Sequence, residues 1–483
     1  MENVNWEKWT KLFTEKRIGT DTQVDDSRSE YQRDFDRLIF NSGFRRLQNK
    51  TQVFPLPGVA FVHNRLTHSL EVASVGRSLG RIIGSRIAKL YETKFPYEAK
   101  NFYQHELSNV IAAACLAHDI GNPPFGHSGE KAISKFFEDN EALVIEKEKK
   151  LKDYFRGVEW DELLNFEGNA NSLRYLTHSF TGKIKGGIRL TYTTLASILK
   201  YPCSVTGIDE KVKHKKKFNF FQNEKDIYKD ICEKTNMQSE GPGLLSYKRH
   251  PFVYLTEAAD DICYKMIDIE DAHRLGIVQT EEVVNLFLNL IYCLKVHKFE
   301  KVQSNTSDIK DPNEKVSYLR AKCINALTVV CADRFMENEP EIIEGTFDDE
   351  LMNIVSKKCS EMKAITDLTE TKIYNHPKVV KLELLGYQIL YDLLELFIPA
   401  ILKEKLTHKD KKLIQVIPRQ FMHDYTIEYN KTTKEYRIIY KNGTDVGSYQ
   451  KVFFVLDFLS GMTDEFALRL YKELKGIEIS SHD

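Results

Sequence analysis

The sequence predicts a mainly α-helical protein. Apolar residues recur every three or four positions in four stretches, residues 70–83, 110–117, 255–266 and 380–393, which is the period of a helix with one buried face. Only 13 prolines and 24 glycines occur in 483 residues, and a cluster of them at 121–126 marks a sharp break. Residues 425–440, YTIEYNKTTKEYRIIY, instead alternate apolar and polar side chains around a polar turn, which predicts one small β-hairpin.

The overall composition limits the function classes. Hydrophobic residues make up 42% of the chain, which is enough for a large core. The 69 basic and 70 acidic residues nearly cancel, so bulk charge indicates neither a nucleic-acid nor a membrane partner. No apolar run approaches the roughly 20 residues that span a bilayer, and the N-terminal residues lack the apolar core of a signal peptide. We therefore expect a cytoplasmic protein with no membrane partner.

The cysteines point to the same compartment. They are scattered along the chain with no C-x-x-C pair, so they indicate neither a zinc knot nor a disulfide framework. We expect buried free thiols in a reducing compartment. The positions are Cys115, Cys203, Cys232, Cys263, Cys293, Cys323, Cys331 and Cys359.

Two runs of charged residues stand out. The first, residues 146–152, is most simply the solvated face of a helix. The second, residues 211–217, is rich in lysine and is followed by Phe218, Phe220 and Phe221. Cations beside aromatic rings suit single-stranded nucleic acid, so this run predicts either a solvated loop, a phosphate contact or a single-stranded DNA surface.

Four residues form a dispersed pattern, H…HD…D, that predicts a metal site. They are His68, His118, Asp119 and Asp260, and each lies in or beside an apolar helical stretch. A single histidine on an apolar helix is usually a core residue, so only the combination is informative. Imidazole nitrogens with carboxylate oxygens suit Mn, Mg, Fe, Co, Ni or Zn rather than a thiolate-preferring ion. Three helices would meet at one metal and leave positions for water and a phosphate oxygen.

The run after the second ligand motif adds a proton-transfer pair. Residues 118–130 read HDIGNPPFGHSGE, in which two prolines force a tight exit from the helix. His127 and Glu130 then stand three residues apart at the start of the next helix and can meet. Glu130 alone could equally be a first-turn acid that complements the helix dipole. Beside His127, it is a candidate to orient a histidine that transfers protons.

The HDIGNPPFGHSGE run and several other motifs resemble those of a known family. HDIGNPPFGHSGE is similar to the HD-domain deoxynucleoside triphosphate triphosphohydrolases, in particular the bacterial dGTPase branch. Further motifs match in order along almost the whole chain. They are residues 33–54, NRLTHSL at 64–70, FEGNAN at 166–171, LKYP at 199–202, KKKFNFF at 215–221, EAADDICY at 257–264 and DFLSGMTDEFALRLY at 457–471.

The resemblance implies roles for these residues. It makes His68, His118, Asp119 and Asp260 the ligands of one divalent metal, Mn²⁺ or Mg²⁺ first and Co²⁺, Ni²⁺, Fe²⁺ or Zn²⁺ as alternatives. Asp261 is the alternative to Asp260. His127 becomes the catalytic histidine and Glu130 its partner. The implied organisation is an N-terminal helical segment at 1–59 that contributes to the active site, an HD core at 60–275, and a C-terminal helical region at 276–483 with the hairpin.

Substrate contacts follow from the same resemblance. Asp260, Tyr264 and Asp268 recur every four residues on one helix face. The ring of Tyr264 would exclude a ribose 2′-hydroxyl, and Asp268 would accept from the 3′-hydroxyl. The implied triphosphate contacts are Arg65, Asn169, Lys200, Tyr201 and Lys217. Gln48 is a candidate sugar or base contact, and Glu383 and Arg419 are candidates for guanine recognition.

The implied reaction is hydrolysis of a deoxynucleoside triphosphate, dGTP favoured, to the deoxynucleoside and inorganic tripolyphosphate. The implied assembly is a homo-oligomer, tetramer or hexamer, and a second nucleotide could act as an effector. Two alternatives stay open. One is another HD phosphohydrolase that cuts nucleoside monophosphates or alarmones, and the other is a nucleotide-sensing or single-stranded DNA-binding protein.

Overall fold

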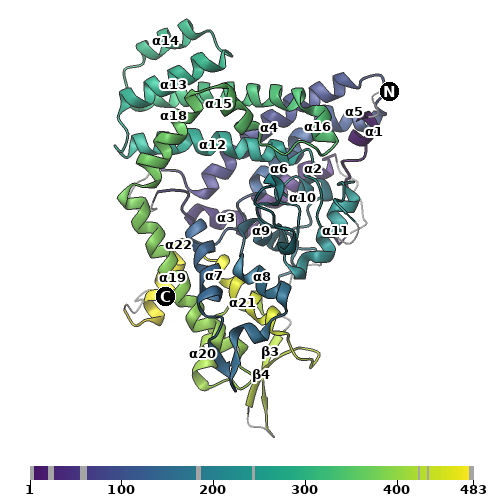
Figure 1. Ribbon diagram of the computed structural model, residues 1–483, viewed down its shortest axis with the longest axis vertical. Coiled ribbons are helices and arrows are strands. Elements are labelled where there is room, and N and C mark those ends of the chain that lie inside the picture. The colour runs from purple at the N-terminus through teal and green to yellow at the C-terminus, as the bar shows by residue number, and fades with distance from the viewer. Residues whose placement is uncertain are drawn as a thin grey trace.

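The computed structural model describes residues 5–19, 27–54, 62–180, 186–241, 245–422, 425–431 and 435–477 (Figure 1). Over these residues the protein is helical apart from two small antiparallel hairpins, which confirms the predicted fold class. The helices of the first half are α1 (Asn5–Trp9), α2 (Glu30–Ile39), α3 (Ser42–Arg46), α4 (Arg65–Leu90), α5 (Tyr97–Asn101), α6 (Leu107–Ala117), α7 (His127–Asp139), α8 (Gly157–Leu164), α9 (Gly168–Thr177), α10 (Tyr192–Ala196) and α11 (Lys225–Lys234).

The second half is also dominated by helices, several of them long. Its helices are α12 (Val253–Arg274), α13 (Thr280–Leu294), α14 (Phe299–Asp308), α15 (Pro312–Glu337), α16 (Glu339–Ile343), α17 (Leu351–Lys358), α18 (Glu361–Leu368), α19 (Pro377–Leu402), α20 (His408–Val416), α21 (Ser448–Ser460) and α22 (Asp464–Leu474). The strands are β1 (Val144–Glu146), β2 (Lys149–Lys150), β3 (Tyr425–Asn430) and β4 (Glu435–Tyr440). The pairing of β3 with β4 confirms the hairpin predicted at 425–440.

Close packing of α4 on α6 sets up the site. Gly76, Gly80 and Gly84 recur every fourth residue of α4 and so lie on one face. A Cβ on Gly80 would lie 2.8 Å from the Ser108 Cα, and one on Gly84 would lie 2.1 Å from the Tyr103 carbonyl oxygen. The glycines therefore allow the two helix backbones to approach, and α12 packs against both helices.

The described residues form two apolar clusters. The upper one in Figure 1 joins α4, α6, α12, α13 and α15, and the lower one joins α7 and α8 to α19, α21 and α22. The lower cluster therefore combines residues from the predicted HD core with residues from the predicted C-terminal region. The three predicted domain ranges stay a prediction, and residues 1–4, 20–26 and 55–59 of the first range lie outside the described residues.

Helix α19 connects the two clusters, and it runs down the left side of Figure 1. By length and composition alone it is the one described helix that could cross a membrane, with a mean hydropathy of 1.4 over its most apolar stretch. In the fold, however, 56% of that stretch is buried, and the helix packs against α7 and α21. We interpret it as a core helix, since contact with other helices already buries much of its apolar surface.

Two sequence expectations need correction. Residues 146–150 form a hairpin rather than a helix, because Lys147 and Glu148 adopt φ values of 49° and 66° between β1 and β2, and a short 3-10 helix begins only at Leu151. The cysteines are not all free thiols, since Cys293 and Cys359 form a disulfide with Cα atoms 6.1 Å apart. The fold places the end of α13 beside the α17–α18 junction, which no sequence motif signals. The other six cysteines are free and buried, as expected.

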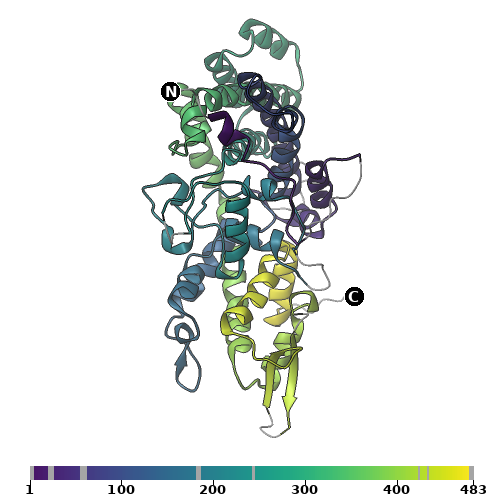
Figure 2. The ribbon, with the colours of Figure 1, turned by 90° about the vertical axis from the view of Figure 1, so that its right-hand side faces the viewer.

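The tip of the molecule is the β3–β4 hairpin, which projects at the lower end in Figure 2. Its cross-strand pairs place Tyr425 opposite Tyr440 and Tyr429 opposite Tyr436. Aromatic cross-strand pairs of this kind stabilise a two-stranded sheet, and the buried Ile438 packs the hairpin onto the lower apolar cluster. The hairpin carries none of the predicted site residues.

Candidate active site

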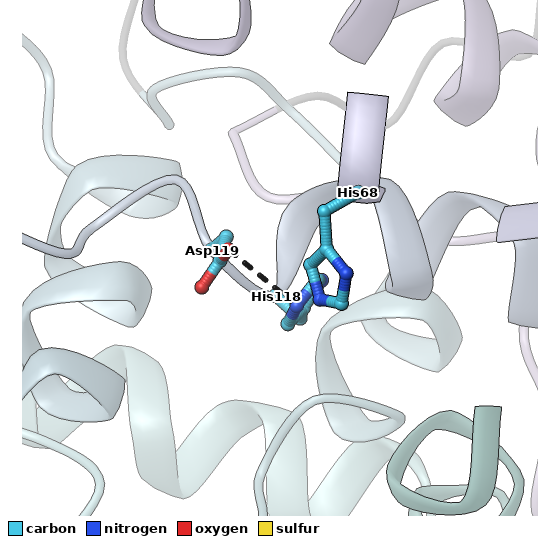
Figure 3. Close-up of side chains that lie close together, drawn as sticks. All are labelled: His68, His118 and Asp119. Atoms are coloured by element: carbon cyan, nitrogen blue, oxygen red, sulfur yellow. Dashed lines mark ion pairs between the residues drawn. The ribbon is translucent and has the colours of Figure 1, made fainter. Parts of the chain in front are cut away.

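The two predicted histidine ligands meet where α4 begins and α6 ends. Asn64 caps α4 through the backbone amide of Thr67, so His68 falls in the first turn of the helix. His118 is the C-terminal cap of α6. The two imidazole rings lie 5.6 Å apart between centroids, and Figure 3 shows them converging with Asp119. His68 is almost fully buried.

Neighbouring groups fix the orientation of His118 and Asp119. The Nδ1 atom of His118 lies 2.6 Å from the carbonyl oxygen of Cys115, which can only accept, so Nδ1 carries the proton and Nε2 faces the site. Asp119 Oδ1 accepts hydrogen bonds from Arg65 Nη1, at 2.8 Å, and from Asn122 Nδ2. Asp119 Oδ2 is buried and has no hydrogen-bond partner among the described residues.

Asp260 completes the predicted set from α12. Its Oδ1 lies 3.0 Å from His68 Nε2 and 3.5 Å from His118 Nε2, so it approaches both histidines. The neighbouring Asp261 also lines the cavity, but its charge faces Lys200, and burial raises its pKa to about 7. The geometry thus favours Asp260 over Asp261 as the ligand from this helix.

The chemistry of this group fits a divalent metal. One ligand atom from each of His68, His118 and Asp119 lies within 4.8 Å of the other two. Burial works against charge here, yet Arg65 and His118 hold the pKa of Asp119 below its usual range, so it stays an anionic ligand. The unpartnered Asp119 Oδ2 supplies the buried acceptor that a cation would satisfy. These residues could hold a metal, and its identity is not specified by them.

His127 and Glu130 form the predicted pair. Gly126 adopts a φ of 57° just before α7, which lets the chain turn sharply so that His127 begins the helix. His127 Nδ1 lies 2.9 Å from Glu130 Oε2, and the histidine side chain is 82% exposed. The hydrogen bond that His127 donates to Glu130, followed by the charge of that carboxylate, raises the pKa of His127. Burial opposes ionisation of Glu130, but His127 keeps the pKa of that carboxyl below its usual range.

All these groups open onto one cavity of about 680 Å³. The cavity collects residues from α4, α7, α9, α12 and α19, as well as from loops, including the one that follows α6. Of the predicted substrate contacts, it is lined by Arg65, Asn169, Lys200, Tyr201, Lys217, Tyr264 and Asp268, together with Glu383. The structure does not bring Gln48 or Arg419 into this lining, because both are exposed, on the short turns Leu47–Asn49 and Arg419–Phe421 respectively.

The cationic wall of the cavity is held by carboxylates. Lys200 Nζ lies 3.1 Å from Glu257, and Lys217 Nζ lies 2.7 Å from Glu167. Glu167 also caps α9 and accepts from Asn169 Nδ2 at 2.6 Å. Each lysine is therefore oriented toward the cavity before any ligand is present.

Two other lysines of the run form ion pairs with the rest of the fold, whereas Lys211 and Lys216 are exposed. Lys213 pairs with Asp349, and Lys215 pairs with Glu240 at 2.5 Å. Phe218, Phe220 and Phe221 are at most 1% exposed and pack in the core. The prediction that these three rings stack on single-stranded DNA is therefore wrong, because buried rings cannot stack on bases.

The part of the cavity lined by Tyr264 and Asp268 also contains a residue that the sequence did not indicate. Tyr374, at the end of the π-helical turn Thr369–Tyr374, donates a hydrogen bond of 2.9 Å to Asp268 Oδ2. Burial raises the pKa of Asp268 to about 7, although this bond opposes the shift. Tyr264 lines the same region. Tyr374 lies far from every motif, so nothing in its local sequence could have identified it.

Two other residues that shape the site lie within the matching motifs without being predicted. Asn122 stands in the HDIGNPPFGH run and orients Asp119, and Glu167 stands in FEGNAN and holds Lys217 and Asn169. Both could have been found from their position beside predicted ligands. Of these contacts, only the ion pair between Glu167 and Lys217 joins two different motifs.

Comparisons with known proteins agree with this site. The HD domain model matches residues 65–179, which include five of the six predicted metal and proton-transfer residues and end before α12. A deoxyguanosinetriphosphate triphosphohydrolase-like protein of Synechocystis sp. is 35% identical over 98% of this chain and 100% of its own length.

Further relatives match over the same extent. A like-named protein of Listeria innocua is 32% identical over 97% of this chain and 100% of its own. The deoxyguanosinetriphosphate triphosphohydrolase of Yersinia enterocolitica is 28% identical over 97% and 98%. The HD model, the end-to-end similarity and the geometry of the cavity agree, and the chain therefore belongs to the deoxyguanosinetriphosphate triphosphohydrolase-like family of HD-domain proteins.

Proposed function

We propose that this protein is a metal-dependent enzyme that hydrolyses a deoxynucleoside triphosphate, dGTP favoured, to the deoxynucleoside and inorganic tripolyphosphate. The observation that carries the proposal is that one cavity joins a His–His–Asp metal group, the His127–Glu130 pair and the cations Arg65, Lys200 and Lys217. A triphosphate requires the cations, and cleavage of its ester requires the metal and the proton donor. The names of the relatives support the same substrate.

The proton chemistry follows from the His127 geometry. Water attacks the α-phosphorus, the bond from phosphorus to the 5′-oxygen breaks, and that oxygen must take up a proton. His127 Nδ1 is engaged by Glu130, so Nε2 is the atom available to the cavity. Glu130 raises the pKa of His127, which favours the imidazolium that can donate this proton. Glu130 itself stays anionic and balances the charge.

The metal would be held by His68, His118, Asp119 and Asp260, with Mn²⁺ or Mg²⁺ as the proposed ion. When bound, a divalent metal polarises a phosphate oxygen and lowers the pKa of its water. Arg65 serves two needs in this proposal. It holds Asp119 at 2.8 Å, and it stands at the cavity surface where a phosphate oxygen can reach it.

Selection of a deoxyribose would rest on Tyr264, Asp268 and Tyr374. The Tyr264 ring fills space beside the sugar, and Asp268 accepts from the 3′-hydroxyl. Tyr374 orients Asp268 through its hydrogen bond to Oδ2. For guanine, Glu383 stands at the cavity and can accept from the N1–H and N2–H groups, whereas Arg419 is exposed and outside the cavity lining. The preference for dGTP therefore rests mainly on the named relatives.

The resemblance extends the proposal to assembly and location. We propose a cytoplasmic homo-oligomer, tetramer or hexamer, whose activity a second nucleotide can raise. Light scattering coupled to gel filtration measures the oligomer, and turnover of one deoxynucleotide with and without another measures activation.

The deciding experiment incubates the purified protein with each dNTP and each rNTP, with Mn²⁺ or Mg²⁺, and resolves the products by ion-exchange chromatography. Tripolyphosphate with the free deoxynucleoside is the expected result. Pyrophosphate with a monophosphate would assign a different hydrolase reaction. No cleavage of any dNTP under any metal would overturn the proposal.

A further inference from the structure

Both oxygens of the Glu130 carboxylate are occupied. Oε2 accepts from His127 Nδ1 at 2.9 Å, and Oε1 accepts from the backbone amide of Gly168 at 3.1 Å. Glu130 is only 8% exposed, so few other groups can reach it. The carboxylate is thus fixed between the histidine that it orients and a backbone N–H group from another motif.

That N–H group belongs to the start of a helix. Gly168 is the first residue of the ten-residue helix α9, directly after the cap residue Glu167. Amides in the first turn have no partner within the helix, and the positive end of the helix dipole lies there. The start of α9 therefore offers donors and a favourable field to anions: the Asn169 amide donates to Glu167, and the Gly168 amide donates to Glu130.

The contact requires glycine for reasons of space. A Cβ on Gly168 would lie 2.2 Å from Glu130 Oε1 and 2.4 Å from Asn122 Oδ1. The backbone of Gly168 does not occupy the left-handed region, and alanine is the better helix former, so neither conformation nor helix stability explains the glycine. Asn122 in turn donates to Asp119 in the metal group. One side-chain carbon at position 168 would push against both halves of the site.

We propose that Gly168 is a positioning residue, whose bare backbone lets the start of α9 hold Glu130 against His127 and leaves Asn122 free to orient Asp119. The inference rests on the proposed function for its kinetic consequences, although the contact itself can be tested without catalysis. A backbone amide here takes the place that a third side chain occupies in other proton-transfer sites.

The test compares Gly168→Ala with Gly157→Ala. Gly157 is the matched control, because it is also the first residue of a helix, α8, and a Cβ there meets nothing within 4 Å. At saturating metal we expect Gly168→Ala to lower kcat by at least about 100-fold, the low end of what general acid–base catalysis contributes. Gly157→Ala should stay within about twofold of the unaltered protein, since surface substitutions rarely matter.

A double-mutant comparison separates positioning from general damage. At saturating metal and in a Glu130→Ala background, Gly168→Ala should change the remaining kcat by less than about twofold, because its effect on kcat passes through Glu130 and its effect through Asn122 is on metal affinity. An equal loss in both backgrounds would overturn the proposal, as would an unchanged kcat in Gly168→Ala alone. Circular dichroism and thermal melting show whether each variant is folded.

The final readout needs no turnover. Titration of ¹³C-labelled histidines, with the His127 signal identified by its loss in His127→Gln, should show the His127 midpoint moving in Gly168→Ala toward the ordinary value of about 6.5. An unmoved midpoint overturns the positioning role. If the unaltered protein cleaves no dNTP while the midpoint still moves, the proposed function fails and the positioning role stands.

Discussion

Two histidines of one cavity, His68 and His127, differ in almost every physical respect. His68 is 1% exposed in the first turn of α4 and faces the carboxylate of Asp260. The His127 side chain is 82% exposed at the start of α7 and has Glu130 behind it. Both are histidines beside a carboxylate. The Nε2 atom of His68 faces Asp260 among the proposed metal ligands, whereas the Nε2 atom of His127 is available to the cavity.

This difference shows how burial decides whether an imidazole is suited to bind a cation or to transfer a proton. A buried imidazole with acidic neighbours on its open side is suited to bind a cation, because a metal ion satisfies all of these groups together. An exposed imidazole held at one nitrogen can exchange its other proton with a substrate. Substitution of His68 should therefore remove metal binding, whereas substitution of His127 should remove proton transfer. Three experiments test this difference, and a fourth concerns a histidine outside the cavity.

The largest effect is expected for His68→Ala. Loss of this nitrogen should abolish metal binding and turnover together, and a metal that contributes several kcal/mol to the transition state corresponds to at least about 10³-fold in kcat. Metal content after gel filtration and dNTP turnover are the two measurements. His105→Ala, at an exposed histidine outside the cavity, is the control and should change neither. Full activity without bound metal would contradict the assignment.

His127→Gln should separate the two properties. Glutamine can still donate to Glu130 but cannot transfer a proton, so kcat should fall by about 10²–10⁴-fold. Metal affinity, measured by titration calorimetry with Mn²⁺, should stay within about twofold, because His127 is not a ligand in our assignment. If the metal is lost with His127, then the two histidines do not have distinct roles.

Asn122→Ala sharpens the comparison from the metal side. Asn122 orients Asp119, and loss of such a supporting hydrogen bond typically weakens metal affinity by about 10–100-fold. Turnover should therefore recover as metal is added, in contrast to His127→Gln, which no metal concentration should rescue. A low kcat that persists at saturating metal would instead place Asn122 in the chemical step.

The smallest effect concerns a third histidine that lies outside the cavity. His63 contacts Asp271 at 2.8 Å and Glu71 at 3.4 Å. Burial opposes its charge, but these carboxylates prevail and raise the pKa of His63 to about 10. We expect His63→Asn to lower the free energy of unfolding by about 1–2 kcal/mol at pH 6, discounted for partial exposure, with no loss of metal.

The sign of the pH dependence follows from the two states. The unfolded histidine loses its proton near pH 6.5, whereas the folded one keeps it up to about pH 10. The stabilisation is therefore complete below pH 6.5 and disappears as pH rises through 10. Melting of both proteins across this range measures it, and a difference that does not shrink with pH would refute the ion-pair account.

Local sequence patterns were sufficient to predict some of the secondary structure and one pair of site residues. Helical periodicity predicted the helices that contain His68 and Asp260, and alternation predicted the β3–β4 hairpin. The HDIGNPPFGHSGE run brought His127 within three residues of Glu130, where helix geometry alone lets them meet. Chemistry that depends on residues close in sequence could thus be predicted from short spacing alone.

Expectations failed where partners are distant in the chain. Phe218, Phe220 and Phe221 look accessible beside a lysine run, but the fold buries them. Cys293 and Cys359 pair only because α13 ends beside the α17–α18 junction. Gln48 belongs to a matching motif and lies on an exposed turn outside the cavity lining, so its role as a sugar or base contact stays a prediction.

The sequence by itself determined the helical class and the spacing of His127 and Glu130, because these depend on period and short spacing, whereas the residues proposed to hold a metal were predicted from a dispersed pattern and a family resemblance. Only the tertiary structure decided which acid of α12 approaches the histidines, that Tyr374 holds Asp268, and that Gly168 supports Glu130. The physical reason is that each of these contacts joins segments whose separation is set by how closely α4, α6, α9 and α12 can pack, and that distance is a property of the whole core.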